Sequence, residues 1–315
     1  MKNLILTAEP ILTIGAALGE GAIWDDEQNL LYWIDIDNCL LNCFDPKTTI
    51  NKSLKLPAKP GCVVRCATAR GGGFILGLPG EFVHLKVDEH LSNDIHTIAV
   101  LAKPEENIAG NRMNDGKCDP AGRFWCGSMD LGCEFPSANL WMLDKAKKLT
   151  RKLSDITISN GIVWNRAHDT MYHIDTACNR VDAFNFDNES GAISDRRELV
   201  LNQWGGHFDG MTIDSDDNLY VAVWGGSAVQ KISSKTGQLI ATISLERVTN
   251  VSSCAFGGEN LQDLYITTAQ NHEASAEANA QARPEANANA EANAGNLFKI
   301  HLSDSQGLPA YQYLG

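Results

Sequence analysis

A hairpin-like segment recurs six times along this chain of 315 residues. Each copy has a short apolar stretch, a polar turn of Asp, Asn, Gly or Glu, and a second apolar stretch with an aromatic residue, which is the pattern of a β-hairpin. Subtraction places the aromatic residues 42, 50, 48, 48 and 45 residues apart. These aromatic residues are Tyr32, Phe74, Phe124, Tyr172, Tyr220 and Tyr265, with the copy around Phe74 the weakest.

Further strand-like stretches, such as LLNCFDP and RVDAFNFD, follow the hairpins, so each unit has about four strands. A unit of this length and strand number is typical of a β-propeller blade. A helical solenoid fits poorly, because the stretches are short and rich in Val, Ile, Tyr and Trp. The sequence therefore predicts an all-β, six-bladed β-propeller that forms a single domain over residues 1–315.

The composition narrows the classes of partner. The net charge of −13 argues against nucleic acid or an anionic membrane, both of which favour a basic surface. No export signal and no run of about 18 apolar residues is present. Nine scattered cysteines then suggest reduced thiols and a cytoplasmic protein. The spacing of Cys39 with Cys43 and of Cys62 with Cys66 permits zinc, although such pairs also simply share one strand face.

Polar residues stand near a glycine at the start of four of the expected first strands. The first strand of each propeller blade lines the central channel, so these starts should meet at one mouth. Five residues later, each of the four strands ends at an Asp or Asn, which makes the positions equivalent. The four residues are Glu20, Asn114, Asn160 and Asp209, and Asp115 follows Asn114 directly.

Two carboxylates and two amide oxygens in one channel form a hard, oxygen-rich cluster. Without a cation the two carboxylates would raise each other's pKa, and a divalent ion relieves that repulsion. Oxygen ligands suit Ca, Mg, Mn or Fe, and Zn is possible. The alternative is that Asn-Gly and Asp-Gly are only turn dipeptides. That alternative does not explain Glu20, because Glu is a poor turn former.

Several motifs carry a family resemblance. LGEGAIWD, NRMNDGKCDPAGRFWCGSM, SNGIVW with MYHIDT, FDGMTIDSDDNLYVAVWGG and CAFGG with DLYITTA resemble the SMP-30/gluconolactonase/luciferin-regenerating-enzyme (regucalcin-like) family. The resemblance covers nearly the whole chain in the same motif order. It implies a six-bladed propeller with one divalent metal ion, for which Ca, Zn, Mn and Fe(II) stay open.

The resemblance also implies roles for individual residues. It implies Glu20, Asn160 and Asp209 as metal ligands, with Asp209 also the candidate general base. It implies Arg112 and Asn114 as substrate contacts, with Asn114 either a substrate contact or a residue behind the metal ligands rather than a ligand itself. Asp130 is a weaker candidate for a polar substrate contact. One departure is His207-Phe208-Asp209, where many relatives read PDG; His207 is either a substrate contact or a surface histidine.

The implied reaction is hydrolysis of a sugar-acid lactone, such as gluconolactone or a pentonolactone, to the aldonic acid. Asp209 acts either as the base or only to position a water whose pKa the metal lowers. Alternatives are an esterase or organophosphatase on the same site, or a non-enzymatic calcium-binding propeller. No GxSxG serine motif and no GxGxxG dinucleotide motif is present.

Residues 271–295 are a low-complexity insert of Ala, Asn and Glu that cannot form a core. The insert falls between the second and third strands expected for the last blade. In a propeller that connection lies on the same face as the metal cluster. The insert is therefore either a lid or a mobile excursion.

Overall fold

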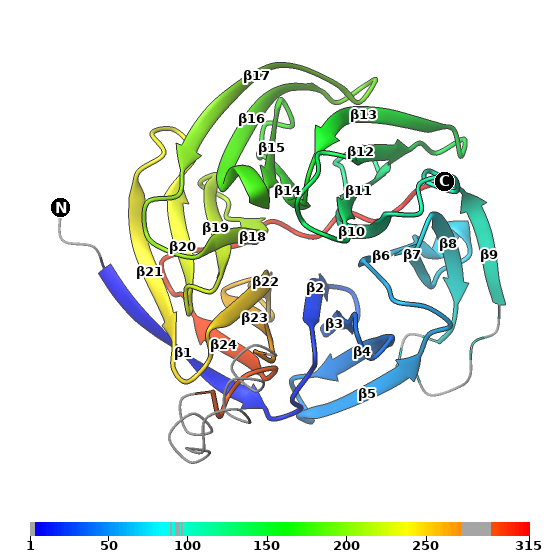
Figure 1. Cartoon of the computed structure of the whole chain (residues 1–315). Coiled ribbons are helices and arrows are strands. Elements are labelled where there is room, and N and C mark those ends of the chain that lie inside the picture. Colours follow the sequence, from blue (N-terminus) through cyan, green and yellow to red (C-terminus); the bar gives the residue numbers. More distant parts are fainter. Residues whose placement is uncertain (1–3, 89, 92–94, 96, 272–290) are drawn as a thin grey trace.

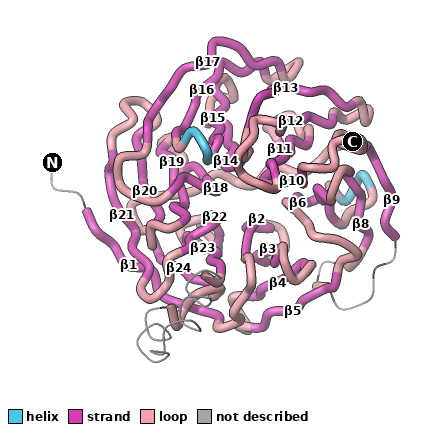
Figure 2. The backbone as a smooth tube through the Cα atoms, in the orientation of Figure 1, coloured by secondary structure: helices cyan, strands magenta, loops and turns pink. Residues whose placement is uncertain are grey.

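The apolar and aromatic stretches form β-strands arranged in a ring about a central axis, as Figure 1 shows. The computed structural model describes all residues except 1–3, 89, 92–94, 96 and 272–290. The described part contains 24 strands and two one-turn 3-10 helices, η1 (Thr68–Arg70) and η2 (Thr176–Cys178) (Figure 2). Within these described residues, no helix is long and apolar enough to span a membrane.

Four of the sheets have four strands each, and in each the sheet order follows the chain order. The first contains β2 (Gly19–Asp25), β3 (Leu30–Asp35), β4 (Leu40–Asp45) and β5 (Ile50–Lys55). The second contains β6 (Cys62–Arg65), β7 (Phe74–Leu78), β8 (Glu81–Lys86) and β9 (Thr97–Ala102). The third contains β10 (Asn111–Cys118), β11 (Phe124–Asp130), β12 (Ala138–Leu143) and β13 (Leu149–Ile156). The fourth contains β14 (Ser159–Trp164), β15 (Thr170–Asp175), β16 (Arg180–Asp187) and β17 (Ala192–Leu201).

The fifth sheet has eight strands and joins the two ends of the chain. Its order is β18-β19-β20-β21-β1-β24-β23-β22. β1 pairs in parallel with β21 and antiparallel with β24, so the N-terminal strand ties the last two groups of strands together. The strands are β1 (Leu4–Leu12), β18 (His207–Ile213), β19 (Asn218–Trp224), β20 (Ala228–Ser233), β21 (Leu239–Leu245), β22 (Asn250–Gly257), β23 (Asp263–Ala269) and β24 (Leu297–His301). The result is an all-β architecture of the propeller type.

The recurring aromatic residues pack between neighbouring sheets. Tyr32 on β3 contacts Phe74 on β7 edge-on, with ring centroids 4.7 Å apart. Tyr265 on β23 stacks on Trp24 of β2, at 5.4 Å between centroids. Aromatic pairs of this kind add to the free energy gained by burying their large surfaces. The repeat of one aromatic residue per hairpin is therefore the signature of the contacts that hold the ring together.

The inner strands end in a common way. In four of them an Asp or Asn stands at the last strand residue or directly after it, and its side-chain oxygen accepts hydrogen bonds from backbone N–H groups of the following turn, a typical Asx turn. These residues are Asp25, Asp119, Asn165 and Asp214. The equivalence expected from the sequence register is thus present in three dimensions.

The C-terminal segment 303–315 runs across the ring at the end where the inner strands finish (Figure 1, red). Gly307 forms a bridge to Asp214, just after β18. The Tyr313 N–H then donates to the Arg65 carbonyl at the end of β6, and the Leu314 N–H donates to the Gly122 carbonyl after β10. Residues 308–311 and the inner strands enclose a cavity of about 70 Å³. One end of the channel is therefore closed by the chain itself, and the opposite end, here called the mouth face, is where the inner strands begin.

The low-complexity insert lies in the connection between β23, which ends at Ala269, and β24, which begins at Leu297. Most of it, residues 272–290, lies outside the described residues, and so does the expectation of a lid or mobile excursion. Where the description resumes, the Glu291 side chain accepts hydrogen bonds from the Thr249 hydroxyl and N–H. Asn293 Nδ2 donates to the Glu246 carbonyl at 2.9 Å. The insert thus returns to the sheet beside the start of β22.

Candidate metal centre

Each of the four polar residues expected at the mouth lies in or beside a β-bulge of an inner strand. The register shifts between Glu20 and Ile23 in β2, Met113 and Gly116 in β10, Ser159 and Ile162 in β14, and Phe208 and Met211 in β18. A bulge disrupts the alternation of side chains and re-aims them, and such bulges are common next to functional sites. The same local distortion therefore presents Glu20, Asn114, Asn160 and Asp209 at the mouth face.

The two asparagines contact each other directly. Asn114 Nδ2 donates to the Ser159 carbonyl at 2.8 Å and to Asn160 Oδ1 at 3.3 Å. Asn114 Oδ1 accepts a hydrogen bond of 2.8 Å from Arg112 Nη1. Both side chains are buried. The polar atoms of Asn114 are thus used within the protein, which suits a residue that positions its neighbours.

Thr176 fixes the orientation of the Asn160 side chain. Asn160 Nδ2 donates to Thr176 Oγ1 at 2.8 Å, and that hydroxyl donates to the Phe208 carbonyl at 2.8 Å. Phe208 directly precedes Asp209, so the chain of hydrogen bonds connects β14 to β18. With its N–H₂ group held in this way, Asn160 presents its carbonyl oxygen on the other side.

Three carboxyl groups interact electrostatically at this face. Burial, followed by the charge of Asp115, raises the pKa of Glu20 to about 8. Burial, followed by the charges of Glu20 and Asp115, raises the pKa of Asp209 well above its usual value. Asp115 Oδ1 accepts the Gly116 N–H, but its buried Oδ2 has no hydrogen-bond partner among the described residues. The positive charges nearby, Arg112 and Lys117, therefore offset the burial and mutual repulsion of these carboxyl groups only in part.

Arg112 supplies part of the missing positive charge. Its charge lowers the pKa of both Glu20 and Asp209, although burial dominates in each case. Arg112 Nη1 donates to the Met113 carbonyl at 3.0 Å as well as to Asn114. Its remaining guanidinium N–H groups have no hydrogen-bond partner within the described part of the chain. They are therefore available to a ligand at the mouth.

Asp130 and His207, the two remaining candidates for substrate contacts, take no part in the hydrogen bonds that join Arg112, Asn114 and Asn160. Asp130 Oδ2 accepts the N–H groups of Glu134 and Phe135, at 3.0 and 3.2 Å, so this carboxylate organises the loop after β11. These hydrogen bonds lower the pKa of Asp130. Its role as a substrate contact stays a prediction. His207, the first residue of β18, is exposed.

No group of three or more His, Cys, Asp or Glu side chains is placed to hold a metal ion in the ranges that the structure describes. The cysteine pairs with four-residue spacing, Cys39 with Cys43 and Cys62 with Cys66, form no such group among the described residues either. All nine cysteines are free thiols. Any ion at the mouth would thus need the Asn160 amide oxygen in addition to carboxylates.

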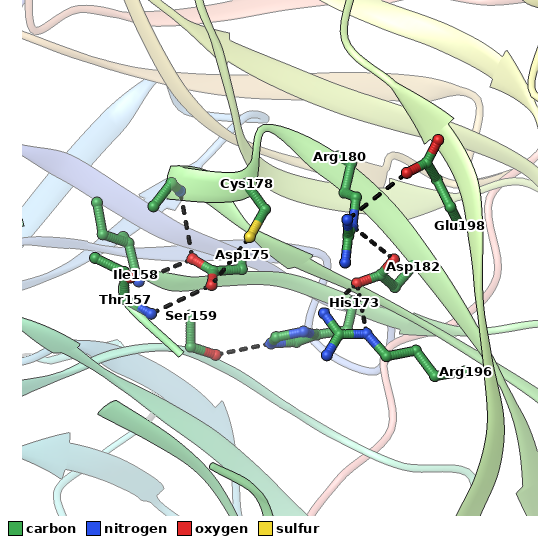
Figure 3. Close-up of polar contacts among 11 residues, drawn as sticks. Thr157, Ile158, Ser159, His173, Asp175, Cys178, Arg180, Asp182, Arg196 and Glu198 are labelled. Atoms are coloured by element: carbon green, nitrogen blue, oxygen red, sulfur yellow. Dashed lines mark hydrogen bonds and ion pairs between the residues drawn. The ribbon is translucent and has the colours of Figure 1, made fainter. Parts of the chain in front are cut away.

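The residues that hold the inner strands in place were not among those expected from the sequence. Asp175, at the end of β15, accepts the N–H groups of Thr157 and Ile158, just before Asn160 (Figure 3). Asp35, at the end of β3, accepts the N–H groups of Ala17 and Leu18 in the same way, just before Glu20. The available signal was the shared ending of YWID and YHID, and Thr176 follows directly in the motif MYHIDT.

His173 supports the same region from within the sheet. Its Nε2 and the Ser159 hydroxyl are hydrogen-bonded at 2.9 Å (Figure 3). The ring is fully buried, and burial, with a smaller effect from the Arg196 charge, lowers its pKa from 6.5 to about 3. The histidine is therefore neutral in the folded protein at any pH above about 3.

This burial predicts a loss of stability in mild acid. Between pH 6.5 and about 3 the unfolded chain binds a proton at His173 that the folded chain excludes, so stability falls as the pH falls through this window. At pH 5 the effect should be about 2 kcal/mol. We expect His173→Gln to lose less stability than the wild type between pH 7.5 and 5 in urea unfolding. The exposed His90→Gln should behave as the wild type, and equal pH sensitivity of all three proteins would contradict the assignment.

Comparison with known proteins identifies the family. Residues 18–270 match the SMP-30/Gluconolactonase/LRE-like region. A Bacillus subtilis protein named as a candidate sugar lactone lactonase, YvrE, is 35% identical over 263 residues, which cover 83% of this chain and 87% of that protein. Regucalcin of Xenopus laevis is 33% identical over 258 residues, covering 80% and 83%. The solved structure of a luciferin-regenerating enzyme superposes with a TM-score of 0.86 at 29% identity, covering 98% of this chain and 99% of that one.

The match covers all strands from β2 to β23 and includes Glu20, Arg112, Asn114, Asn160 and Asp209. Repeat, fold, motif order and overall similarity agree, and the chain belongs to the SMP-30/gluconolactonase/luciferin-regenerating-enzyme family.

Proposed function

We propose that this protein hydrolyses sugar lactones to the corresponding aldonic acids with the help of one divalent metal ion. The observation that carries the proposal is the group of buried, mutually repelling carboxyls at the mouth, next to an arginine with unused donors. The relative YvrE, named for sugar lactones, supports the choice of substrate class.

We also propose that the ring has six blades and is a single domain. The eight-stranded sheet consists of two runs of four strands, β18–β21 and β22–β24 with β1, which meet at the parallel pair of β1 and β21. Counting each run as one blade gives one blade for each hairpin repeat. The strand β1 then completes the last blade from the other end of the chain.

The residues at the mouth fit a divalent ion. Glu20, Asn160 and Asp209 would hold it, because their oxygen atoms are the donors that hard cations prefer. The raised pKa of Glu20, about 8, reflects a carboxyl group that is buried without sufficient positive charge nearby. When bound, the ion would supply Lewis-acid polarisation of the lactone carbonyl.

The side chains of this protein have separate tasks in the proposed reaction. Arg112 would orient the substrate through its unused N–H groups, and Asn114 holds Arg112 at 2.8 Å. Asp209 would accept a proton from the attacking water, which forms the new bond to the carbonyl carbon. The bond from that carbon to the ring oxygen then breaks, and the ring oxygen takes up a proton to become the free hydroxyl of the acid.

A release assay for acid tests the proposal. The metal-stripped protein should release acid from gluconolactone, arabinonolactone or xylonolactone no faster than the spontaneous background. Restoring Ca, Mn, Zn or Fe(II) should raise the rate at least about tenfold over background, since metal-assisted hydrolysis depends on the ion. Tight binding of an ion without acid release from any of these lactones would refute the lactonase and leave a binding protein or another hydrolase.

A further inference from the structure

A second pocket opens on the mouth face, beside the candidate metal centre. It has a volume of about 450 Å³, within the range of roughly 300–1,000 Å³ typical of small-molecule sites. We call it the rim pocket. It is lined by Ala17, Leu18, Asp37, Trp224, Gly225, Thr249, Asn250, Gln270 and Asn271.

The rim pocket lies next to the candidate metal centre, because residues that line it lie near Glu20 in the chain or on β19, the strand that pairs with β18. Leu18 lies two residues before Glu20, at the start of β2. Trp224 ends β19 opposite His207, which lies two residues before Asp209 in β18. Asp37 lies close enough to Arg112 for its charge to raise the pKa of that guanidinium, against the larger effect of burial. One molecule could therefore reach both places.

The side chains of the rim pocket offer unused hydrogen-bonding groups. Asn250 is only 7% exposed, yet its side-chain amide has no hydrogen-bond partner among the described residues. Gln270 Nε2 donates to the Gly15 carbonyl at 2.9 Å, which leaves the side-chain oxygen for another partner. A side-chain amide that lines a pocket and has no partner in the protein can both donate to a ligand and accept from it. Asn250 thus points to a ligand with hydroxyl groups, which can donate and accept.

Trp224 adds a partly exposed aromatic face to these polar groups. Within the described residues its indole N–H has no hydrogen-bond partner and its ring has no aromatic or cationic partner. The amphipathic indole offers both a flat apolar surface and a donor. The motif AVWGG, which contains Trp224, has no other task in the proposed function.

We propose that the rim pocket binds the hydroxyl-bearing carbon chain of the sugar lactone, with Trp224 against its C–H face and Asn250 on its hydroxyls. This inference rests on the proposed lactonase function, because it assumes that the lactone carbonyl lies at the metal centre. Asp37, which accepts a hydrogen bond from Lys59 at 2.8 Å, lines the boundary between the two. The rim pocket would thereby select polyhydroxylated lactones over plain ones.

The test compares two lactones in the full-length, metal-loaded protein. Trp224→Ala and Asn250→Ala should each lower kcat/KM for gluconolactone about tenfold or more, mainly through KM, because a site built around hydroxyls loses their hydrogen bonds and contact. For δ-valerolactone, which has no hydroxyl groups, the change should be less than about twofold by the same reasoning. Trp224→Phe should keep most of the gluconolactone activity, since a flat ring remains.

Asn260→Ala is the matched control, because Asn260 is exposed in the turn between β22 and β23 at the opposite end of the channel. Melting curves identify any variant that fails to fold. Equal losses for both lactones, or none, in folded variants would overturn the rim pocket.

A binding arm separates this inference from the proposed function. If the wild type hydrolyses neither lactone, the proposed lactonase function is wrong. Calorimetric titration with gluconate then still measures whether the rim pocket binds a hydroxyl-bearing chain. Binding by the wild type and Asn260→Ala, but not by Trp224→Ala or Asn250→Ala, would support the pocket alone. Binding that none of the substitutions affects, or no binding at all, would overturn it.

Discussion

Asp209→Ala is expected to abolish lactone hydrolysis and to weaken divalent-ion binding by at least about tenfold, because one charged ligand is worth more than 1.4 kcal/mol at such a centre. Asp209 is the residue to which we assign both ion binding and proton transfer. The measurement is acid release together with calorimetric titration of the ion. Normal activity in this variant would refute the site.

The same substitution should not destabilise the metal-free protein. The folded state raises the pKa of Asp209 through burial and through the charges of Glu20 and Asp115, so its charged form opposes folding above the pKa of the unfolded chain. Removing it relieves that opposition, and the melting temperature without metal should stay equal or rise. Asp216→Ala, which removes an exposed carboxylate from the turn after β18, is the control and should keep activity and ion binding. A large drop in melting temperature would mean that Asp209 is structural.

Tyr313→Ala should lower the free energy of unfolding by about 3–5 kcal/mol, the usual cost of removing a large buried aromatic side chain. Tyr313 is 1% exposed and packs in the core between the β6 and β10 sheets. Its hydroxyl donates to the Asp144 carbonyl at 2.9 Å, and its backbone forms a parallel β-bridge with Cys66. Urea unfolding gives the measurement.

Tyr313→Phe separates packing from hydrogen bonding. It keeps the ring and loses one hydrogen bond, so it should cost only about 1 kcal/mol. Because the C-terminal segment closes the end opposite the mouth, both folded variants should keep the wild-type KM for lactones. A Tyr313→Ala midpoint equal to that of the wild type would show that the segment does not hold the ring together.

The positions of the four polar residues at the mouth could be predicted from the sequence, but the orientation of their side chains could not. Glu20, Asn114, Asn160 and Asp209 share a register that the Asx turns at the inner-strand ends reproduce. The bulges that re-aim them leave no separate mark in the sequence. The contact of Thr176 with Asn160 also depends on two strands folding back on one another.

Asp115 and Asp130 are two carboxylates whose surroundings could not be predicted from the sequence. Asp115 was noted only as the neighbour of Asn114, yet its charge raises the pKa of both Glu20 and Asp209. Asp130 accepts N–H groups from its own loop, which the sequence did not indicate, while its expected contact with substrate stays a prediction. Which way a carboxylate points is decided by the nearest available donors, and those are known only once the loop has folded.

By itself the sequence determined the all-β repeat, the hairpins, the polar turns and the equivalent positions of Glu20, Asn114, Asn160 and Asp209, because strand periodicity and turn chemistry are local. The tertiary structure alone decided that β1 joins β21 and β24, that residues 303–315 close the far end of the channel, and that Trp224 and Asn250 line one pocket. Each of these brings together segments far apart in the chain, and such contacts depend on how whole sheets pack rather than on any local pattern.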